Sequence, residues 1–299
     1  MQTVFSQVSG WLSSSIDGML VLTCMQFVSR ACSKGAGVSE SVTLPSGRTT
    51  LYETSGTGTP LVLIHGAESA RGQFDDFRPA LSPGIRAISY DQRDTAVDDV
   101  GDEQYDLGLL ADDLAEFLTA LGLPEVHVLG TSFGGAVAQH FALRHSNRVR
   151  SLTLAATMAS AAPLAAFAAR TAGKTPQEMA VVMGESGVSP HAAAADPGLP
   201  GRLEAALVVR APAQRARRRR AVLAHDVEQR LAEITAPTLV VHGTDDPIVP
   251  FSSAETIAAL IPKARLVPLE GGRHAVSLEF RDRLAALVSE FVLAGAEAG

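Results

Sequence analysis

Short apolar runs alternate with longer amphipathic stretches along the chain from Ser39 onward. The short runs are rich in aliphatic and β-branched residues, as expected for strands that are buried on both faces. They predict strands at Ser39–Leu44, Arg48–Thr54, Leu61–His65, Ile85–Tyr90, Val126–Gly130, Val149–Ala155, Thr238–His242 and Arg265–Pro268. Pro45-Ser46-Gly47 joins the first two strands into a hairpin. The strand–helix order predicts an α/β fold with a mostly parallel central sheet flanked by helices.

The longer stretches carry apolar residues at helical spacing. They predict helices at Leu107–Leu121, Gly134–Arg144 and Ser277–Leu293. In the first of these helices, Asp112, Asp113 and Glu116 lie on the face opposite to the leucines, so we expect all three carboxylates to contact water.

The alternation breaks once, between Met158 and Ile234. This stretch is rich in Ala and Arg, contains no convincing strand, and is interrupted at Asp196–Gly201. We interpret residues 158–234 as a helical lid inserted into a core formed by residues 38–157 and 235–295. Residues 1–37 precede that core as an N-terminal extension to which the sequence assigns no role.

A basic run lies inside the predicted lid and comprises Arg215, Arg217, Arg218, Arg219 and Arg220. Such a run can bind an anion or an acidic partner, or it can form a helix face that contacts water. The second interpretation is the commoner one, and Asp226 and Glu228 partly neutralise the run. An acidic substrate or carrier partner stays open.

Composition and charge exclude several classes of function. Of the 299 residues, 46% are apolar and 19% are charged, which excludes a disordered or collagen-like chain. The net charge of −7 gives no general attraction to phosphates, so we expect no nucleic-acid partner. The apolar stretch Met19–Val28 spans ten residues, against about twenty in a membrane-spanning helix, so we expect no membrane span.

The two cysteines, Cys24 and Cys32, do not have the spacing of a zinc or redox motif. The first Lys or Arg is Arg30, so no basic region precedes the apolar stretch as in a secretory signal. We therefore expect a cytoplasmic protein. Its oligomeric state is left open. Because no phosphate-binding loop, H-E-x-x-H motif or Cys/His cluster is present, we also expect chemistry without a cofactor or metal.

The sharpest candidate for chemistry is the segment Gly130-Thr131-Ser132-Phe133-Gly134-Gly135 between a predicted strand and a predicted helix. A nucleophile on a sharp strand-to-helix turn needs small neighbours, because the strained backbone leaves no room for side chains. The turn also sets Ser132 at a helix N-terminus, which favours developing negative charge. Ser132 is therefore the predicted nucleophile, and a glycine-rich packing turn is the alternative.

A serine hydroxyl needs a base, and the base needs an orienting acceptor. His274 follows Gly271-Gly272 in the turn after the last predicted strand, whereas packing or solvent contact explains the other seven histidines. Asp245 and Asp246 both follow the strand ending at His242 and are candidate acceptors. An oxyanion needs two backbone N–H donors, and Phe133 and Ala67 occupy the positions expected of them. The Phe133 ring is equally suited to the core.

The motifs above resemble the α/β-hydrolase fold family, specifically its serine esterases of the pimeloyl-carrier methyl-ester type. The resemblance covers Ser39–Val292 through the segments Leu61–Gly66, Tyr90–Arg93, Gly130–Gly135, Gly243–Pro250 and Gly271–His274. It implies that Asp246, in a G-x-x-D-P turn, is the acid and Asp245 a turn-forming residue. It also implies that Ser132 excludes the dehalogenase and epoxide-hydrolase branches, which use Asp at this position.

The segment Tyr90–Thr95 resembles the Y-D-x-R-D-T segment of anthracycline methyl-ester esterases, which implies an ester of a secondary metabolite. The family usually continues with Gly and Ser, whereas Ala96-Val97-Asp98 follows here. The resemblance further implies that Asp91 and Arg93 form a structural ion pair.

Together these observations predict a hydrolase of a small or medium, partly apolar carboxylic ester, acting through an acyl-enzyme with Ser132, His274 and Asp246. An acyltransferase, amidase, carbon–carbon hydrolase or cofactor-free perhydrolase would use the same three residues. A ligand-binding member of the fold without turnover is the alternative from another class.

Overall fold

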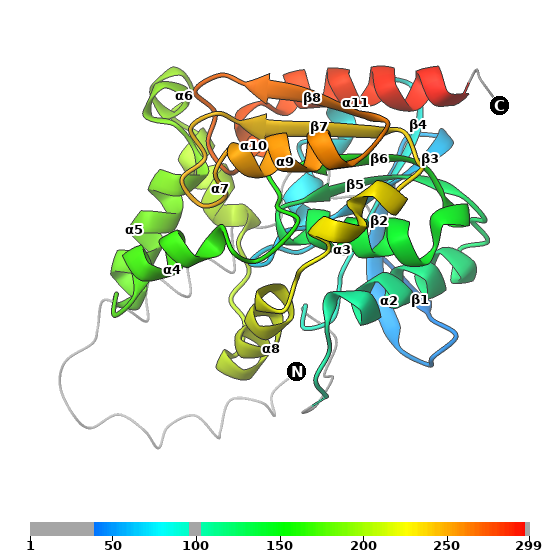
Figure 1. The fold of residues 1–299 in the computed structure, drawn as a ribbon, viewed down its shortest axis with the longest axis horizontal. Helices are drawn as coiled ribbons and strands as arrows, with labels where there is room; N and C mark the ends of the chain where they lie inside the picture. The colour runs from blue at the N-terminus through cyan, green and yellow to red at the C-terminus, as the bar shows by residue number, and fades with distance from the viewer. Residues whose placement is uncertain (1–38, 96–102, 297–299) are drawn as a thin grey trace, which may run out of the picture. The chain divides into compact units, whose positions relative to one another are not determined.

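The computed structural model describes residues 39–95 and 103–296, and its main feature is an eight-stranded sheet (Figure 1). The strands lie in the order β1-β2-β4-β3-β5-β6-β7-β8. Their bounds are β1 Glu40–Thr43, β2 Thr49–Ser55, β3 Gly58–Ile64, β4 Gly84–Tyr90, β5 Val126–Thr131, β6 Val149–Ala155, β7 Thr238–Gly243 and β8 Ala264–Leu269. Strand β2 pairs antiparallel with β1 and β4, and the other neighbouring strands are parallel. The predicted mostly parallel sheet and its strands are confirmed.

Apolar layers cover both faces of the sheet. Successive side chains of a strand point to opposite faces, so Val62 and Ile64 belong to one buried cluster and Leu61 and Leu63 to the other. Because both faces are covered, the central strands carry nearly continuous apolar runs. These layers hold the strands in place and fix the edge at which their carboxyl ends meet.

Four long or medium helices cover the sheet: α2 Leu107–Ala120, α3 Phe133–Arg144, α9 Ser252–Leu260 and α11 Arg281–Ala296. Helices α2, α3 and α9 pack into the first cluster, and α11 packs into the second. The shorter elements are η1 Arg71–Phe74, η2 Arg78–Ala80, η3 Ser146–Arg148 and α10 Val276–Glu279. The single helix predicted over 277–293 is wrong in one respect, because α10 and α11 are separate and meet at Phe280.

Helix α2 departs from the prediction at Asp113, whose carboxylate is buried rather than wet. It accepts from the Arg93 guanidinium at 2.6 and 3.0 Å and lies 2.7 Å from Arg48 Nη1. A buried carboxylate is tolerated when cations pair with it, and these two arginines supply that pairing. Asp112 does lie at the surface, beside Arg144.

Residues 158–234, called the insertion below, contain helices and no strand. The helices are α4 Leu164–Thr171, α5 Pro176–Gly187, α6 Pro190–Ala195, α7 Leu199–Ala206, α8 Pro212–Leu223 and η4 Glu228–Glu233. Figure 1 shows α4 to α7 beyond the carboxyl ends of β7 and β8. The predicted interruption is too long, because α7 already begins at Leu199 with Pro200 in its first turn, where proline is tolerated.

Some expectations lie outside the described residues: the N-terminal extension with its apolar stretch and two cysteines, and the departure at Ala96-Val97-Asp98. Among the helices that the structure describes, none has the length and apolar character needed to cross a membrane.

Candidate active site

The turn between β5 and α3 carries Ser132 in a strained conformation, with φ 53° and ψ −119°. A side chain on any of the flanking glycines would collide with the surroundings. A Cβ at Gly130, Gly134 or Gly135 would lie 2.3, 2.1 or 2.6 Å from its nearest neighbouring atom. The Ser132 N–H donates to the Ala155 carbonyl at the end of β6, at 2.9 Å. The turn therefore has the geometry of a nucleophile elbow.

Ser132, His274 and Asp246 lie in one hydrogen-bonded row. His274 Nε2 is 2.9 Å from Ser132 Oγ, and His274 Nδ1 is 2.7 Å from Asp246 Oδ2. The three residues come from the ends of β5, β8 and β7, which meet at the same edge of the sheet. Of the two acid candidates, Asp246 contacts the imidazole, whereas Asp245 is exposed.

The Asp246 carboxylate is buried and held as an anion. Its Oδ1 accepts from the Ile248 and Val249 N–H groups at 2.9 and 3.0 Å. Burial by itself would raise its pKa, but attraction to His274 and hydrogen bonds from His242 and His274 outweigh burial and hold the pKa of Asp246 well below its ordinary value. An ionised carboxylate only accepts, so Nδ1 of His274 carries the proton of that bond. A neutral imidazole with its proton on Nδ1 has Nε2 free to accept from the Ser132 hydroxyl.

The loop after β3 lies against the elbow. A Cβ on Gly66 would be 3.9 Å from Ser132 Cβ. The Gly66 N–H donates to Gln73 Oε1, and Gln73 Nε2 donates to Thr131 Oγ1, both at 2.8 Å. Gln73 thus ties the end of β3 to the residue before Ser132. Gln73 could not be predicted from the sequence, because a single Gln outside any motif gives no signal.

His65 also stabilises the loop after β3, through two hydrogen bonds. Its Nδ1 is 2.8 Å from the Gly66 carbonyl, and its Nε2 accepts from the Gln92 N–H at 3.3 Å. Burial, aided by repulsion from Arg218 and other arginines, lowers the pKa of His65 well below its ordinary value. The ring is therefore a neutral packing residue, which agrees with the role expected for it.

The two residues expected to supply oxyanion donors, Phe133 and Ala67, directly follow Ser132 and Gly66 in the chain. Phe133 begins α3, and its ring lies in the buried core, so its side chain is a core aromatic as the alternative interpretation stated. Ala67 follows Gly66 and packs against the same cluster. Side chains matter little at these two positions, because the expected donors are backbone N–H groups.

The basic run divides between two environments. Arg215, Arg219 and Arg220 are exposed, as expected for a helix face in water. Arg217 and Arg218 are buried, which contradicts that expectation for these two residues. Arg217 donates from Nε and Nη2 to the two carboxylate oxygens of Asp94, at 2.9 and 2.7 Å.

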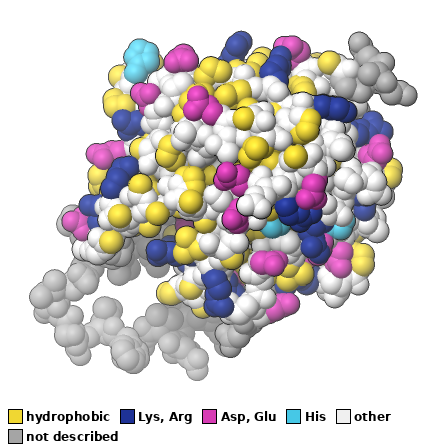
Figure 2. All heavy atoms as spheres, in the orientation of Figure 1, with side chains coloured by type: hydrophobic (Ala, Val, Ile, Leu, Met, Phe, Trp, Pro, Cys, Tyr) yellow, Lys and Arg dark blue, Asp and Glu magenta, His cyan; other side chains and the backbone are white. Residues whose placement is uncertain are grey.

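On the face shown in Figure 2, acidic and basic side chains are interspersed, and neither sign of charge forms a separate patch.

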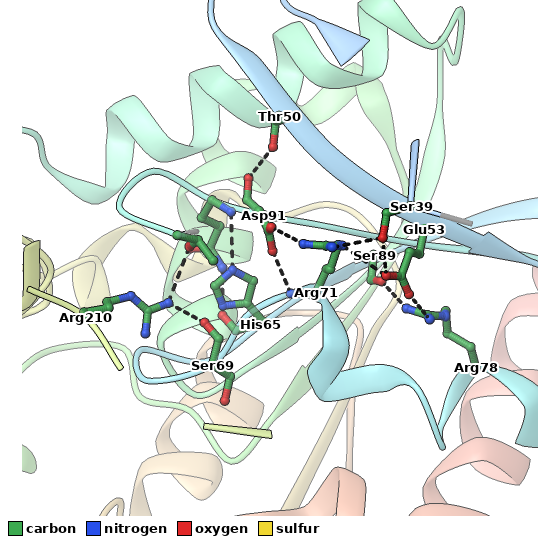
Figure 3. Close-up of polar contacts among 12 residues, drawn as sticks. Ser39, Thr50, Glu53, His65, Ser69, Arg71, Arg78, Ser89, Asp91 and Arg210 are labelled. Carbon is green, nitrogen blue, oxygen red and sulfur yellow. Dashed lines mark hydrogen bonds and ion pairs between the residues drawn. The ribbon is translucent and has the colours of Figure 1, made fainter. Parts of the chain in front are cut away.

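Asp91 and Arg93 do not pair with each other, contrary to expectation. Asp91 accepts from the Arg71 backbone N–H at 2.9 Å and binds the Arg71 guanidinium, which also contacts Glu53 (Figure 3). Arg93 binds Asp113 as described above. Both residues are thus structural, with other partners.

Within residues 39–95 and 103–296, no group of three or more His, Cys, Asp or Glu side chains is placed to hold a metal ion.

The insertion reaches the loop that carries the imidazole. The His274 N–H donates to the Ser186 carbonyl at 3.1 Å, and the Ala275 N–H donates to the Gly187 carbonyl at 2.8 Å. Both acceptors lie at the end of α5. The position of the His274 loop is therefore coupled to the insertion.

The chain is similar in sequence and in fold to known hydrolases. The chain is 30% identical over 239 residues to a putative carbamate hydrolase RutD from Azorhizobium caulinodans, covering 76% of this chain and 88% of that relative. It is 27% identical over 270 residues to a 2-hydroxymuconate semialdehyde hydrolase from Pseudomonas putida, covering 82% and 90%. A solved thermophilic esterase from Thermogutta terrifontis superposes with a TM-score of 0.76 at 25% identity, covering 86% and 98%. Because the family model described as the alpha/beta hydrolase family matches residues 61–287, the chain belongs to that family.

Proposed function

We propose that the protein hydrolyses a carboxylic ester through an acyl-enzyme formed on Ser132. The observation that carries this proposal is the row of two short hydrogen bonds, 2.9 Å from Ser132 Oγ to His274 Nε2 and 2.7 Å from His274 Nδ1 to Asp246 Oδ2. The strained turn that presents Ser132 supports it, because a packing turn has no need of that strain.

In the proposed reaction, Ser132 Oγ attacks the ester carbonyl while His274 Nε2 takes the hydroxyl proton. Asp246 stabilises the imidazolium and keeps its orientation. His274 then returns the proton to the leaving alcohol as the carbon–oxygen bond breaks. Water, deprotonated by the same imidazole, then attacks the acyl-enzyme. His274 returns that proton to Ser132 Oγ as the bond between this oxygen and the acyl carbon breaks, which releases the acid and free Ser132.

The backbone N–H groups of Phe133 and Ala67 are the proposed donors to the tetrahedral oxyanion. Phe133 directly follows the nucleophile at a helix N-terminus, and Ala67 follows Gly66, which adjoins Ser132. In tested enzymes one such donor contributes about 2.7–4 kcal/mol to transition-state stabilisation.

The proposed substrate is small or medium in size and partly apolar, and the insertion acts as the lid over it. Apolar side chains of the insertion, among them Leu164, Phe167 and Met183, pack against Ile248 and Val249 beside the Asp246 loop. An apolar acyl or alcohol group would extend this surface. The finer assignment to methyl esters rests on the resemblance to the pimeloyl-carrier esterases and on the Tyr90–Thr95 segment, which resembles anthracycline methyl-ester esterases.

Hydrolysis of p-nitrophenyl esters of graded acyl length, with a methyl ester and a thioester alongside, tests the proposal. We expect turnover of esters that falls by about 10⁶-fold in Ser132→Ala, the effect of removing the serine in a protease. Ser46→Ala, at an exposed serine, is the matched control and keeps wild-type activity. No hydrolysis of any ester by the folded wild type contradicts the proposal.

A carbon–carbon hydrolase is the second candidate, favoured by the relative from Pseudomonas putida that is named for 2-hydroxymuconate semialdehyde. The same three residues would serve that reaction. The competing substrates separate the two candidates: turnover of 2-hydroxymuconate semialdehyde with a kcat/KM above that of every ester supports the second, and the reverse order supports the first.

A further inference from the structure

Arg218, a side chain of the insertion, contacts both residues expected to carry oxyanion donors. It lies on α8, is 2% exposed, and its guanidinium carbon sits 4.3 Å from the centre of the Phe133 ring. Its Nε donates to the Ala67 carbonyl at 2.9 Å, and its Nη2 donates to the Gly66 carbonyl at 3.3 Å. Its Nη1 donates to the Arg93 carbonyl at 2.9 Å.

The hydrogen bond from Arg218 Nη2 to the Gly66 carbonyl affects the orientation of the Ala67 N–H. These two groups belong to the same planar peptide, and in a trans peptide they point in opposite directions. None of the described peptide bonds is cis. Arg218 Nη2, His65 Nδ1 and the Ser69 N–H all bind the Gly66 oxygen, so together they fix the direction in which the Ala67 N–H points. Hydrogen bonds to the carbonyl further polarise the peptide and strengthen its N–H as a donor.

The charge of Arg218 is placed differently from that of its neighbour Arg217. Arg217 is neutralised by Asp94 at 2.7 Å. Arg218 binds backbone carbonyls, and no carboxylate of the described residues forms an ion pair with it. A buried guanidinium stays protonated, because its ordinary pKa is far above neutrality. Arg218 therefore places a positive charge against the 66–67 turn, which favours an oxyanion there, and the nearby carboxylates of Glu68 and Asp94 partly offset it.

We propose that Arg218 is a positioning residue for the oxyanion donors, through which the docked insertion fixes the 66–67 turn and the Phe133 ring. This proposal rests on the proposed function. It implies that α8 does more than cover the substrate, since the turn loses its orienting contact when α8 moves away.

The test compares Arg218→Gln, Arg218→Lys and Arg219→Gln, the last being the same change at an exposed position one residue along. For the best ester, we expect Arg218→Gln to lower kcat by about 10–100-fold with KM within about twofold, since one lost oxyanion donor costs about 10²–10³ in kcat. Arg218→Lys keeps the positive charge but loses the planar guanidinium. We therefore expect its kcat to lie between that of the wild type and that of Arg218→Gln. Arg219→Gln matches the wild type.

Inhibition by a trifluoromethyl ketone analogue of the ester separates positioning from simple loss of packing. Its affinity follows transition-state stabilisation, so its Ki rises in proportion to the fall in kcat/KM. A rise in KM with kcat unchanged, or a loss of activity that only tracks the folded fraction measured by circular dichroism, overturns the proposal.

Failure of this proposal and failure of the proposed function have different signatures. Ester hydrolysis by the wild type with Arg218→Gln equal to Arg219→Gln overturns the positioning role and leaves the function standing. If the wild type hydrolyses no ester, hydrogen exchange of residues 65–68 decides the positioning role. Faster exchange in Arg218→Gln than in Arg219→Gln supports it, and equal exchange overturns it.

Discussion

At the scale of single residues, the site depends on positions where the backbone leaves no choice of side chain. Ser132 adopts φ 53°, and Gly134 lies so close to the end of β3 that a Cβ would be 2.1 Å from the Ile64 carbonyl oxygen. The requirement for glycine was predictable from the motif. The contact with Ile64 was not, because it joins the start of α3 to the end of β3, which are distant in sequence.

Gly134→Ala should lower the free energy of unfolding by about 1–3 kcal/mol, since the added methyl group forces the elbow away from β3. The matched control is Gly184→Ala in α5, where a Cβ has no neighbouring atom within 4 Å. There we expect a gain of up to about 1 kcal/mol from helix propensity. Urea denaturation measures both, and equal effects at the two sites would contradict this reasoning.

Asp246→Asn should lower kcat by about 10⁴-fold, the size of the corresponding change in a serine protease triad. The amide keeps the shape but offers no charge, and it no longer fixes the imidazole with its proton on Nδ1. Asp245→Asn, at the exposed neighbour, should leave kcat unchanged. Steady-state kinetics with the best ester distinguish the two variants, and a full effect at position 245 would reverse the assignment.

At the scale of elements, the sequence predicts the strands and helices that local pattern determines. It does not predict features that depend on packing between distant segments. The strands were recognisable because apolar runs end at glycines, prolines and polar turns. Helix α9 was missed, because Ser252–Leu260 has few large apolar residues. The inward side of α8 was also missed, because a row of arginines predicts a wet face, whereas Arg217 and Arg218 find acceptors on distant loops.

Helix α2 tests whether burial determines how much a carboxylate contributes to stability, because it carries buried Asp113 and partly exposed Asp112. Asp113→Ala removes the buried acceptor of the Arg93 guanidinium, and we expect a loss of roughly 3 kcal/mol in the free energy of unfolding. Asp112→Ala removes partly exposed contacts with Arg144 and His145, and we expect a smaller loss of about 1 kcal/mol. Equal losses of unfolding free energy in the two variants would show that the burial of Asp113 does not determine how much it contributes to stability.

At the scale of the whole molecule, the parallel sheet brings three distant segments to one edge. Topology made Ser132, Asp246 and His274 predictable as candidates, since each follows a strand whose carboxyl end lies at that edge. The same packing buries His127 and half-buries His140, which take no part in the row. Burial lowers the pKa of His127 and of His140 to about 4, with repulsion from Arg150 and His225 adding to the effect.

These histidines predict that the fold loses stability in mild acid. The unfolded chain binds protons at its histidines near pH 6.5, whereas the folded chain keeps His127 and His140 neutral down to about pH 4. Between these values the unfolded state binds more protons, so stability falls as pH falls, by up to about 1.4 kcal/mol per pH unit for each histidine. Urea denaturation at pH 7, 6 and 5 measures the slope. His127→Gln should reduce it, and an unchanged stability across this range would contradict the prediction.

The central claim, that Ser132 is a nucleophile activated by His274, is tested most directly by fluorophosphonate labelling followed by mass spectrometry of the intact chain and its peptides. The account predicts one adduct per chain, located on Ser132, absent in Ser132→Ala and formed far more slowly in His274→Ala. A folded wild-type chain that takes up no label, or takes it up at another residue, would contradict the account.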